Sequence, residues 1–378
     1  MSAPDPDRLA RAALSRIFEP GDLRVSRLVE ELGAGTVYDA LRGERDLEGV
    51  LTDVAGRLAE VDPARELAQA ARLGVRFVVP GDAEWPRQLD GLAGAAALQE
   101  RGGLPLGLWV RGPLRLDTLD RSVAVVGSRS ATTYGAGVAA EVAAVTAREG
   151  FTVVSGAAFG IDQAAHRGAV AAGGTSVAVL ACGADRVYPA AHRGMIEHLA
   201  AEGAVLSETP PGGAPTRLRF LSRNRIIAAL THGTVVVEAA VRSGALNTAN
   251  WATRLNRSLM GVPGPVTSAP SQGVHQLIRT GAATLVTSGA DVLEMLGGAG
   301  EHLVEEPRAA ERPRDRLSTR HQQVLDAVPS ERAAGTDSIA RAAGIGLREV
   351  RSALDALERR GLVHCVAEGW RLAALAHT

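Results

Sequence analysis

The chain has 378 residues, of which 46% are hydrophobic, so it can bury the cores of two or three domains. Its 41 basic and 42 acidic residues leave a net charge of −1, which excludes a polycation, so nucleic-acid binding would need a local concentration of arginine. With two distant cysteines, no signal peptide and no membrane-spanning apolar run, the chain is expected to be cytoplasmic and free of disulfides and metal sites.

Residues 1–73 are predicted to form a small helical domain. Apolar residues recur at helical spacing from Leu23 to Leu32 and again from Leu51 to Leu58, and Gly33 and Gly35 interrupt the pattern. This arrangement is typical of a helix-turn-helix bundle, including the helix-hairpin-helix kind. A DNA-binding role and a simple packing or docking role both remain open.

Residues 74–296 have a different pattern, in which short β-branched runs alternate with helix-length stretches. The alternation predicts an α/β domain: a Rossmann-like, doubly wound, mostly parallel sheet with helices on both faces. The ligand crevice of such a sheet lies at the carboxyl ends of its strands. The expected strands are Arg76–Val79, Val123–Val126, Thr152–Ser155, Ser176–Leu180, Ala204–Ser207, Thr234–Val237, Leu259–Val262 and Thr284–Val286. The expected helices include Gly137–Arg148, Gly160–Ala172, His192–Ala201 and Leu246–Leu255.

The remaining chain is predicted to be a linker, residues 297–316, followed by a winged-helix domain, residues 317–378. Glycine, proline and mixed charges dominate the linker, which has little to bury. The order of three helices and a hairpin is typical of a winged helix, with Leu347–Arg360 as the recognition helix. A dimerisation or protein-docking domain is an equally open interpretation. The expected elements are Ser318–Val328, Thr336–Ala343, Leu347–Arg360 and the hairpin Leu362–Leu372.

Three strand ends in the sheet domain are followed by loops of glycine and small hydroxyl residues. Glycine allows a backbone to approach a phosphate closely, and the amides of such loops can surround an anion. The glycine spacing after Val126 does not match a dinucleotide-binding fingerprint, and the loops could also be plain strand-to-helix turns. The candidate residues in these loops are Gly127, Ser128, Arg129, Ser155, Gly156, Gly160, Ser243 and Gly244.

The segment 217–225 holds four arginines and one of the five phenylalanines of the chain. Arginine binds phosphate oxygens in pairs, and a nearby aromatic ring can stack on an unpaired base. Because duplex bases expose no ring face, this combination favours a single strand. The alternative is an ion-pair network with Glu208 and Glu238 as partners. The candidate residues here are Arg217, Phe220, Arg223, Asn224 and Arg225.

Taken in order, the motifs between about Gly74 and Leu296 resemble those of the DNA-processing A (DprA/Smf) family. One departure is Leu221, where the family usually has proline, a change that could loosen the loop presenting Phe220. The segments that carry the resemblance are Val126–Arg129, Val154–Asp162 with His166, Ala178–Pro189, Ser207–Pro211, Phe220–Arg225, Val235–Ala239 with Ser243 and Gly244, and Val262–Gly264.

The resemblance implies a protein that binds single-stranded DNA and loads the RecA recombinase onto it during DNA uptake, natural transformation and recombination. The resemblance also implies that Arg129 binds a phosphate, that Arg217 makes a basic DNA contact and that Phe220 stacks on a base. The glycine and serine amides of the loops would line the DNA groove. A homodimer is also expected, supported by apolar positions in Val274–Leu296.

An enzyme is the competing interpretation, because glycine loops on a Rossmann-like sheet also resemble cytokinin-activating phosphoribohydrolases. Those enzymes need a PGG-x-GT-x-x-E loop, whereas Val262–Gly264 continues here to Pro265, Val266 and Thr267. Asp162 and His166, four residues apart on a predicted helix, more often form a stabilising contact than a catalytic pair. A transcription regulator would leave the largest domain without a purpose. We therefore expect a non-catalytic binding protein without a cofactor.

Overall fold

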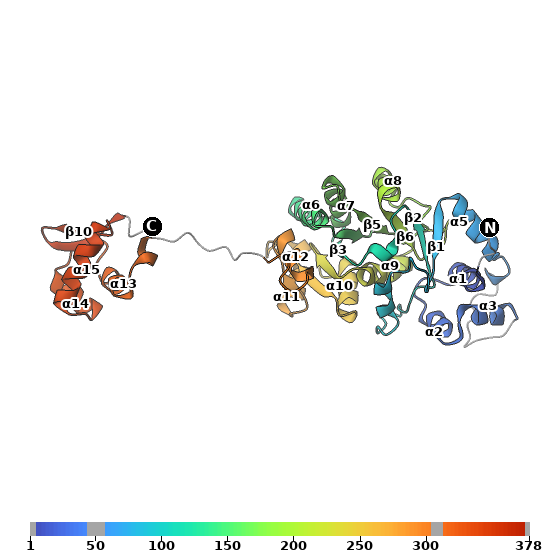
Figure 1. The fold of residues 1–378 in the computed structure, drawn as a ribbon, viewed down its shortest axis with the longest axis horizontal. Coiled ribbons are helices and arrows are strands. Elements are labelled where there is room, and N and C mark those ends of the chain that lie inside the picture. Colours follow the sequence, from blue (N-terminus) through green and yellow to red (C-terminus); the bar gives the residue numbers. More distant parts are fainter. Residues whose placement is uncertain (1–4, 44–56, 304–312, 375–378) are drawn as a thin grey trace. The chain divides into compact units, whose positions relative to one another are not determined.

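The computed structural model describes residues 5–43, 57–303 and 313–374, and the chain divides into two compact units, residues 1–304 and 305–378 (Figure 1). The predicted helical segment and the predicted sheet domain both fall in the first unit. Leu51 and Val54, which contributed to the helical pattern, lie outside the described residues.

The first unit begins with helices that pack against one another and against the sheet. Asp5 and Asp22 accept backbone N–H groups at the starts of two of these helices, which satisfies donors that the first turn leaves free. Leu14, Val37 and Leu41 are fully buried between the helices. The helices are α1 (Pro6–Ile17), α2 (Leu23–Leu32), α3 (Ala34–Arg42) and α5 (Pro63–Arg72).

A nine-stranded sheet forms the centre of this unit, in the order β1-β2-β6-β5-β4-β3-β7-β8-β9. Strands β3 to β9 pair in parallel, whereas β2 is antiparallel to both β1 and β6. The mostly parallel, Rossmann-like sheet is thus confirmed, with strand ends within one residue of those predicted. Only β2 was not predicted. The strands are β1 (Val75–Val78), β2 (Leu108–Arg111), β3 (Ser122–Val126), β4 (Thr152–Ser155), β5 (Ser176–Val179), β6 (Ala204–Ser207), β7 (Gly233–Val236), β8 (Ser258–Gly261) and β9 (Thr284–Leu285).

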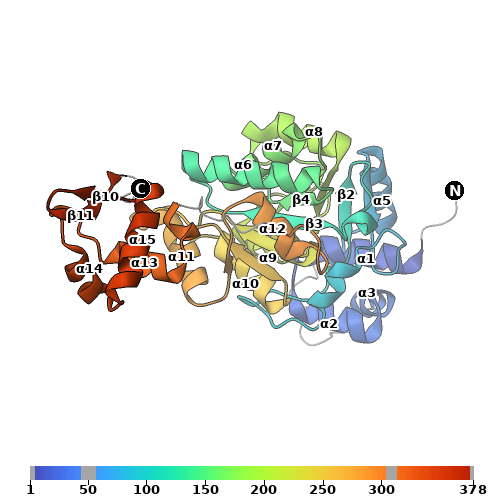
Figure 2. The ribbon, with the colours of Figure 1, turned by 60° about the vertical axis from the view of Figure 1, so that its left-hand side comes forward.

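Helices cover both faces of the sheet: α6, α7 and α8 lie on one face and α9 and α10 on the other (Figures 1 and 2). Alternate residues of β3 divide between the two cores, since Val123 and Val125 pack with α6 and α7 while Ala124 and Val126 pack with α9 and α10. Among the described residues, no helix is long and apolar enough to cross a membrane. The helices are α6 (Thr133–Arg148), α7 (Ile161–Ala171), α8 (Arg193–Glu202), α9 (Arg217–Leu230), α10 (Ala245–Arg254), α11 (Gln272–Arg279) and α12 (Gly289–Leu296).

The second unit contains three helices and a hairpin around a core of its own. Val324, Ile339, Leu354 and Leu357 are buried in that core. The elements follow the order expected of a winged helix, and that assignment stays a prediction. Within the predicted linker, Pro313–Arg316 forms a short 3₁₀ turn. The elements are α13 (Thr319–Asp326), α14 (Thr336–Ala343), α15 (Leu347–Arg359), β10 (Val363–Val366) and β11 (Gly369–Leu372).

Candidate nucleic-acid interface

A groove of about 1070 Å³ opens at the carboxyl ends of β3 and β7. The chain runs from β3 through β4 and β5 to β6 in one direction, then returns to place β7 on the other side of β3. This reversal separates the loops that follow the two strands and leaves a crevice between them. Residues 126–130, 215–227 and 240–250 supply most of its walls.

The groove collects most of the candidate residues predicted from the sequence. Those that line it are Gly127, Ser128, Arg129, Arg217, Phe220, Arg223, Asn224, Ser243 and Gly244. The other four candidates lie behind it or beside it, and they are Ser155, Gly156, Gly160 and Arg225. The predicted crevice is therefore present.

The charge of the groove differs from that of the chain. Of the residues that the structure describes, arginines 129, 217, 223 and 242 line it, against a single acid, Asp162. A wall of four cations and one anion attracts a polyanion even though the chain as a whole carries a net charge of −1.

Arg129 and Phe220 combine a cation with an aromatic ring at the mouth of the groove. The guanidinium carbon of Arg129 lies 4.7 Å from the centroid of the Phe220 ring. Arg129 is exposed and Phe220 is half-buried. Tyr188 adds a second ring, whose centroid is 5.8 Å from that of Phe220. Arg129 thus offers hydrogen-bond donors to a phosphate, and the neighbouring Phe220 offers an aromatic ring to a base.

Arg223 lies deeper, against the end of β4. A Cβ atom on Gly156 would come within 1.2 Å of a guanidinium nitrogen of Arg223, so the side chain occupies its present position only while residue 156 is glycine. Asp162 accepts the backbone N–H groups of Gly156 and Ala158 at 3.1 and 3.4 Å. Burial raises the pKa of the Asp162 carboxyl and lowers the pKa of Arg223, while the opposite charge of each partly offsets the shift of the other.

Ser155 and Gly160 shape the loops without lining the groove. The hydroxyl of Ser155 donates to the carbonyl of Val125 at 2.7 Å and so ties β4 to β3. Gly160 has φ +79°, and a Cβ there would lie 2.3 Å from the carbonyl oxygen of Ser128. The turn before α7 can approach the loop of Arg129 only because this residue is glycine.

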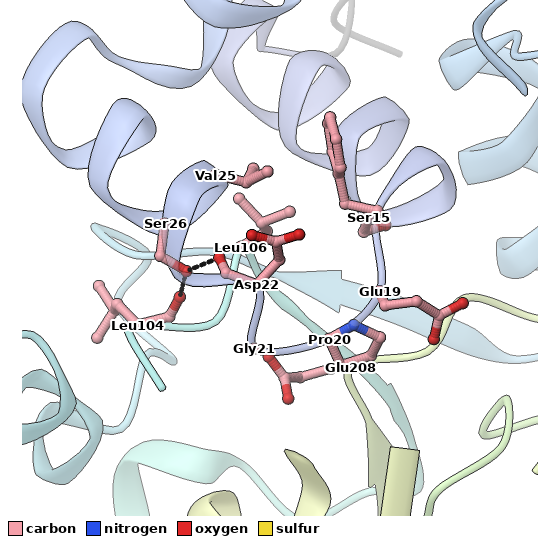
Figure 3. Close-up of a pocket in the computed structure, with 12 residues that line it drawn as sticks. Ser15, Glu19, Pro20, Gly21, Asp22, Val25, Ser26, Leu104, Leu106 and Glu208 are labelled. Carbon is pink, nitrogen blue, oxygen red and sulfur yellow. Dashed lines mark hydrogen bonds between the residues drawn. The ribbon is translucent and has the colours of Figure 1, made fainter. Parts of the chain in front are cut away.

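Arg225 does not belong to the interface, and this corrects our prediction. Its side chain is fully buried and pairs with Glu208, with a bond of 2.6 Å from Nη2 to Oε1. A guanidinium in such a pair cannot reach a phosphate without leaving a buried carboxylate unpaired. Figure 3 shows Glu208 next to Pro20 and Gly21, two residues of the segment that connects α1 to α2.

The Arg225–Glu208 pair is the ion-pair alternative named for this segment, whereas Glu238 and His166 have other partners. Glu238 accepts the amide and the hydroxyl of Thr132 at 2.9 and 2.5 Å, which fixes the start of α6. The Nδ1 atom of His166 lies 2.8 Å from the hydroxyl of Ser176 rather than beside Asp162, and burial lowers the pKa of His166 to about 3. These side chains have structural partners.

Sequence reasoning missed Arg242, Tyr188, Asn247 and Gln99, all of which line the groove. Arg242 is exposed and directly precedes the predicted Ser243, so a basic neighbour of a predicted loop was the available signal. The Asn224 amide donates to Asn247 at 3.2 Å, and the Asn247 amide donates to Gln99 at 3.2 Å. This chain of amides joins α9, α10 and the 93–100 segment, a contact that no local pattern encodes.

A mostly parallel sheet with an arginine-lined groove at its switch point defines a Rossmann-like protein whose groove has the charge to attract anions. The family model described as DNA recombination-mediator protein A matches residues 76–297. The chain belongs to this family. A putative DNA processing protein DprA from Mycobacterium tuberculosis is 43% identical over 372 residues, which cover 97% of this chain and 95% of that protein.

Two solved structures of the family resemble this fold. DNA processing protein A from Streptococcus pneumoniae matches with a TM-score of 0.64 and 30% identity, over 79% of this chain and 100% of that one. DNA processing protein A from Helicobacter pylori, studied for its single-stranded DNA binding mode, matches with a TM-score of 0.51 and 24% identity, over 58% of this chain and 95% of that one. The family membership makes this chain a DNA recombination mediator.

Proposed function

We propose that the groove binds single-stranded DNA. The observation that carries the proposal is the Arg129 guanidinium 4.7 Å from the ring of Phe220, at the mouth of a groove lined by arginine. The arginines would neutralise phosphates, and the ring would take an unpaired base. The Helicobacter relative is described as binding single-stranded DNA, which supports the same assignment here.

The test is a titration of labelled oligo-dT and of a blunt duplex of equal length, at low and at high salt. We expect the single strand to bind more tightly, because a duplex hides its ring faces. We also expect affinity to fall steeply with salt, because each phosphate contact releases counterions. Equal affinity for the two ligands would refute the proposal.

We further propose that the chain helps to load RecA recombinase onto the bound strand during DNA uptake and recombination. The description of the family as a recombination mediator supports this step. Adding the protein to RecA and to DNA covered by single-strand-binding protein should shorten the lag before RecA hydrolyses ATP. An unchanged lag would contradict the proposal.

We propose that the groove acts by binding alone. Glu238, a buried carboxylate that follows β7, already accepts two hydrogen bonds from Thr132. Among the described residues, no group of three His, Cys, Asp or Glu side chains could hold a metal ion. Hydrolysis of a nucleoside monophosphate that disappears in Glu238→Gln would instead identify an enzyme.

A further inference from the structure

Exposed aromatic rings of the first unit gather at one edge of the sheet. All the Phe, Tyr and Trp residues of the chain fall in the described ranges, and three of them are exposed. Tyr134 and Phe159 are 46% exposed and Tyr188 is 42% exposed. They follow β3, β4 and β5, respectively, so each lies at the carboxyl edge where the groove opens.

Tyr188 continues the surface that begins at Phe220, and Phe159 lies on a neighbouring loop, linked to the Tyr188 segment through His192. The ring of Tyr188 is 5.8 Å from that of Phe220, and Tyr188 itself lines the groove. Phe159 packs edge-on against His192, with ring centroids 4.5 Å apart. Tyr188 and His192 belong to the same short segment before α8. We call Phe220, Tyr188 and Phe159 the aromatic strip.

The loop that carries Phe159 is fixed by contacts with His192 and with the Arg129 loop. His192 is buried, and its Nδ1 atom lies 2.9 Å from the carbonyl oxygen of Ala157, which fixes the ring that supports Phe159. Gly160, next to Phe159, packs against the backbone of Arg129. The loop that carries Phe159 therefore touches the loop that carries the phosphate-binding candidate of the groove.

We propose that Tyr188 and Phe159 stack on further bases of the bound strand, beyond the one at Phe220. The inference rests on the proposed function and lengthens its site along the ends of β5 and β4. Positive charge accompanies the rings, because Arg186 is exposed two residues before Tyr188. Rings interleaved with arginine suit a single strand, whose bases each present a face and whose backbone carries the charge.

The experiment compares oligo-dT of about 5 and about 15 nucleotides, lengths chosen from the usual site sizes of single-strand binders. Phe159→Ala should weaken binding of the longer strand roughly 5- to 100-fold and leave the shorter strand nearly unaffected. Phe159→Trp should restore the loss. Tyr188→Trp should keep binding and give a tryptophan emission that the longer strand quenches.

Phe159→Leu is the critical variant, because leucine keeps an apolar contact with His192 but has no ring face. It should lose affinity for the longer strand with an unchanged thermal melt. Leu73→Ala changes a position that is also 46% exposed but lies just before the amino end of β1, at the opposite edge of the sheet from the groove, so it should bind both lengths normally.

The outcomes separate this inference from the proposed function. Failure of the wild-type chain to bind either length would refute single-strand binding itself. Tight wild-type binding with Phe159→Ala and Phe159→Leu unchanged on the longer strand would refute only the extension. A longer strand that is abasic beyond its first nucleotides should make wild type and Phe159→Leu bind equally, and a persisting difference would also overturn it.

Discussion

Helix α9 carries four arginines in its first nine residues, and they point in two directions. Arg217 and Arg223 line the groove, whereas Arg219 and Arg225 turn away to Glu19 and Glu208. Position on the helix does not account for this division, because Arg219 and Arg223 are four residues apart and lie on the same side of an α-helix. Their side chains extend to different partners, Arg219 to Glu19 and Arg223 to the region of Gly156 and Asp162. Equal side chains in one short segment thus have opposite roles.

Arg129 and Phe220 should respond differently to truncation. Arg129→Ala removes a charge, so it should weaken binding of any sequence and lower the salt slope by about one unit. Phe220→Ala removes a stacking face, so it should cost roughly 1–3 kcal/mol and leave the salt slope nearly unchanged. Titrations of both variants at several salt concentrations measure the two effects.

A thermal melt of each variant is the control for folding. Phe220 is half-buried at the groove, so Phe220→Ala should melt close to wild type, and Phe220→Trp should recover most of the affinity. A markedly earlier melt of Phe220→Ala would show a core residue instead, because such a change in a core costs roughly 3–5 kcal/mol.

The sequence identified most of the groove and misassigned one arginine. Gly127 to Arg129 could be found because a glycine loop after a buried strand has a local pattern. The sequence named Glu208 as a possible ion-pair partner of this segment, but only the fold decides that Arg225, and not another of the four arginines, forms that pair. The segment around Phe220 was interpreted as a loop, whereas it belongs to α9, which begins at Arg217. Thr216 caps this helix, because its side chain accepts a hydrogen bond from the backbone N–H of Arg219.

At the scale of elements, the end of β4 and helix α9 meet through Gly156 and Arg223. Gly156→Ala should displace the guanidinium of Arg223, weaken single-strand binding and cost roughly 1–3 kcal/mol of stability through overpacking. Denaturant unfolding and the oligo-dT titration measure the two losses.

Gly137→Ala is the matched control, because Gly137 lies exposed on α6 and a Cβ there would meet nothing within 4 Å. It should bind normally and gain about 0.5–1 kcal/mol, since alanine favours a helix more than glycine does. A Gly156→Ala variant that behaves like this control would mean that Arg223 has room to move.

Strands with continuous β-branched runs were predictable to within a residue, because a buried parallel strand is apolar on both faces. Strand β2 was missed because its four residues, Leu108–Arg111, lie among glycines and prolines that indicate loop. Its antiparallel pairing with β1 and β6 depends on contacts distant in sequence. Helix α9 was not predicted because buried arginines occupy positions that would be apolar in an ordinary amphipathic helix, so the sequence lacks helical periodicity there.

At the scale of the whole molecule, the first unit ends in a sheet edge that could pair with a second copy. Val274, Val292 and Leu293 pack inside the chain, but Leu285 on the edge strand β9 is 49% exposed and Met295 is 39% exposed. An exposed strand edge with apolar side chains is a site of association. We propose a homodimer through this edge, which would place two grooves in one particle and add avidity.

Light scattering at micromolar concentration should give twice the mass of the chain, and Leu285→Asp should give the mass of one chain with an unchanged melt. A wild-type monomer would contradict the homodimer. A Leu285→Asp dimer would place the interface elsewhere on the molecule.

The contacts on the rear of α9 have a consequence for modularity. Arg219 pairs with Glu19, the Ser222 hydroxyl donates to the carbonyl of Pro20 at 2.6 Å, and the helix that faces the groove is thereby braced by the segment between α1 and α2. A cut at Gly74, where the residue pattern changes, would remove the brace and leave Arg219 without its carboxylate partner Glu19. We therefore expect the sheet cut at Gly74 to unfold at a lower temperature than the intact first unit, because the rear of α9 loses both contacts.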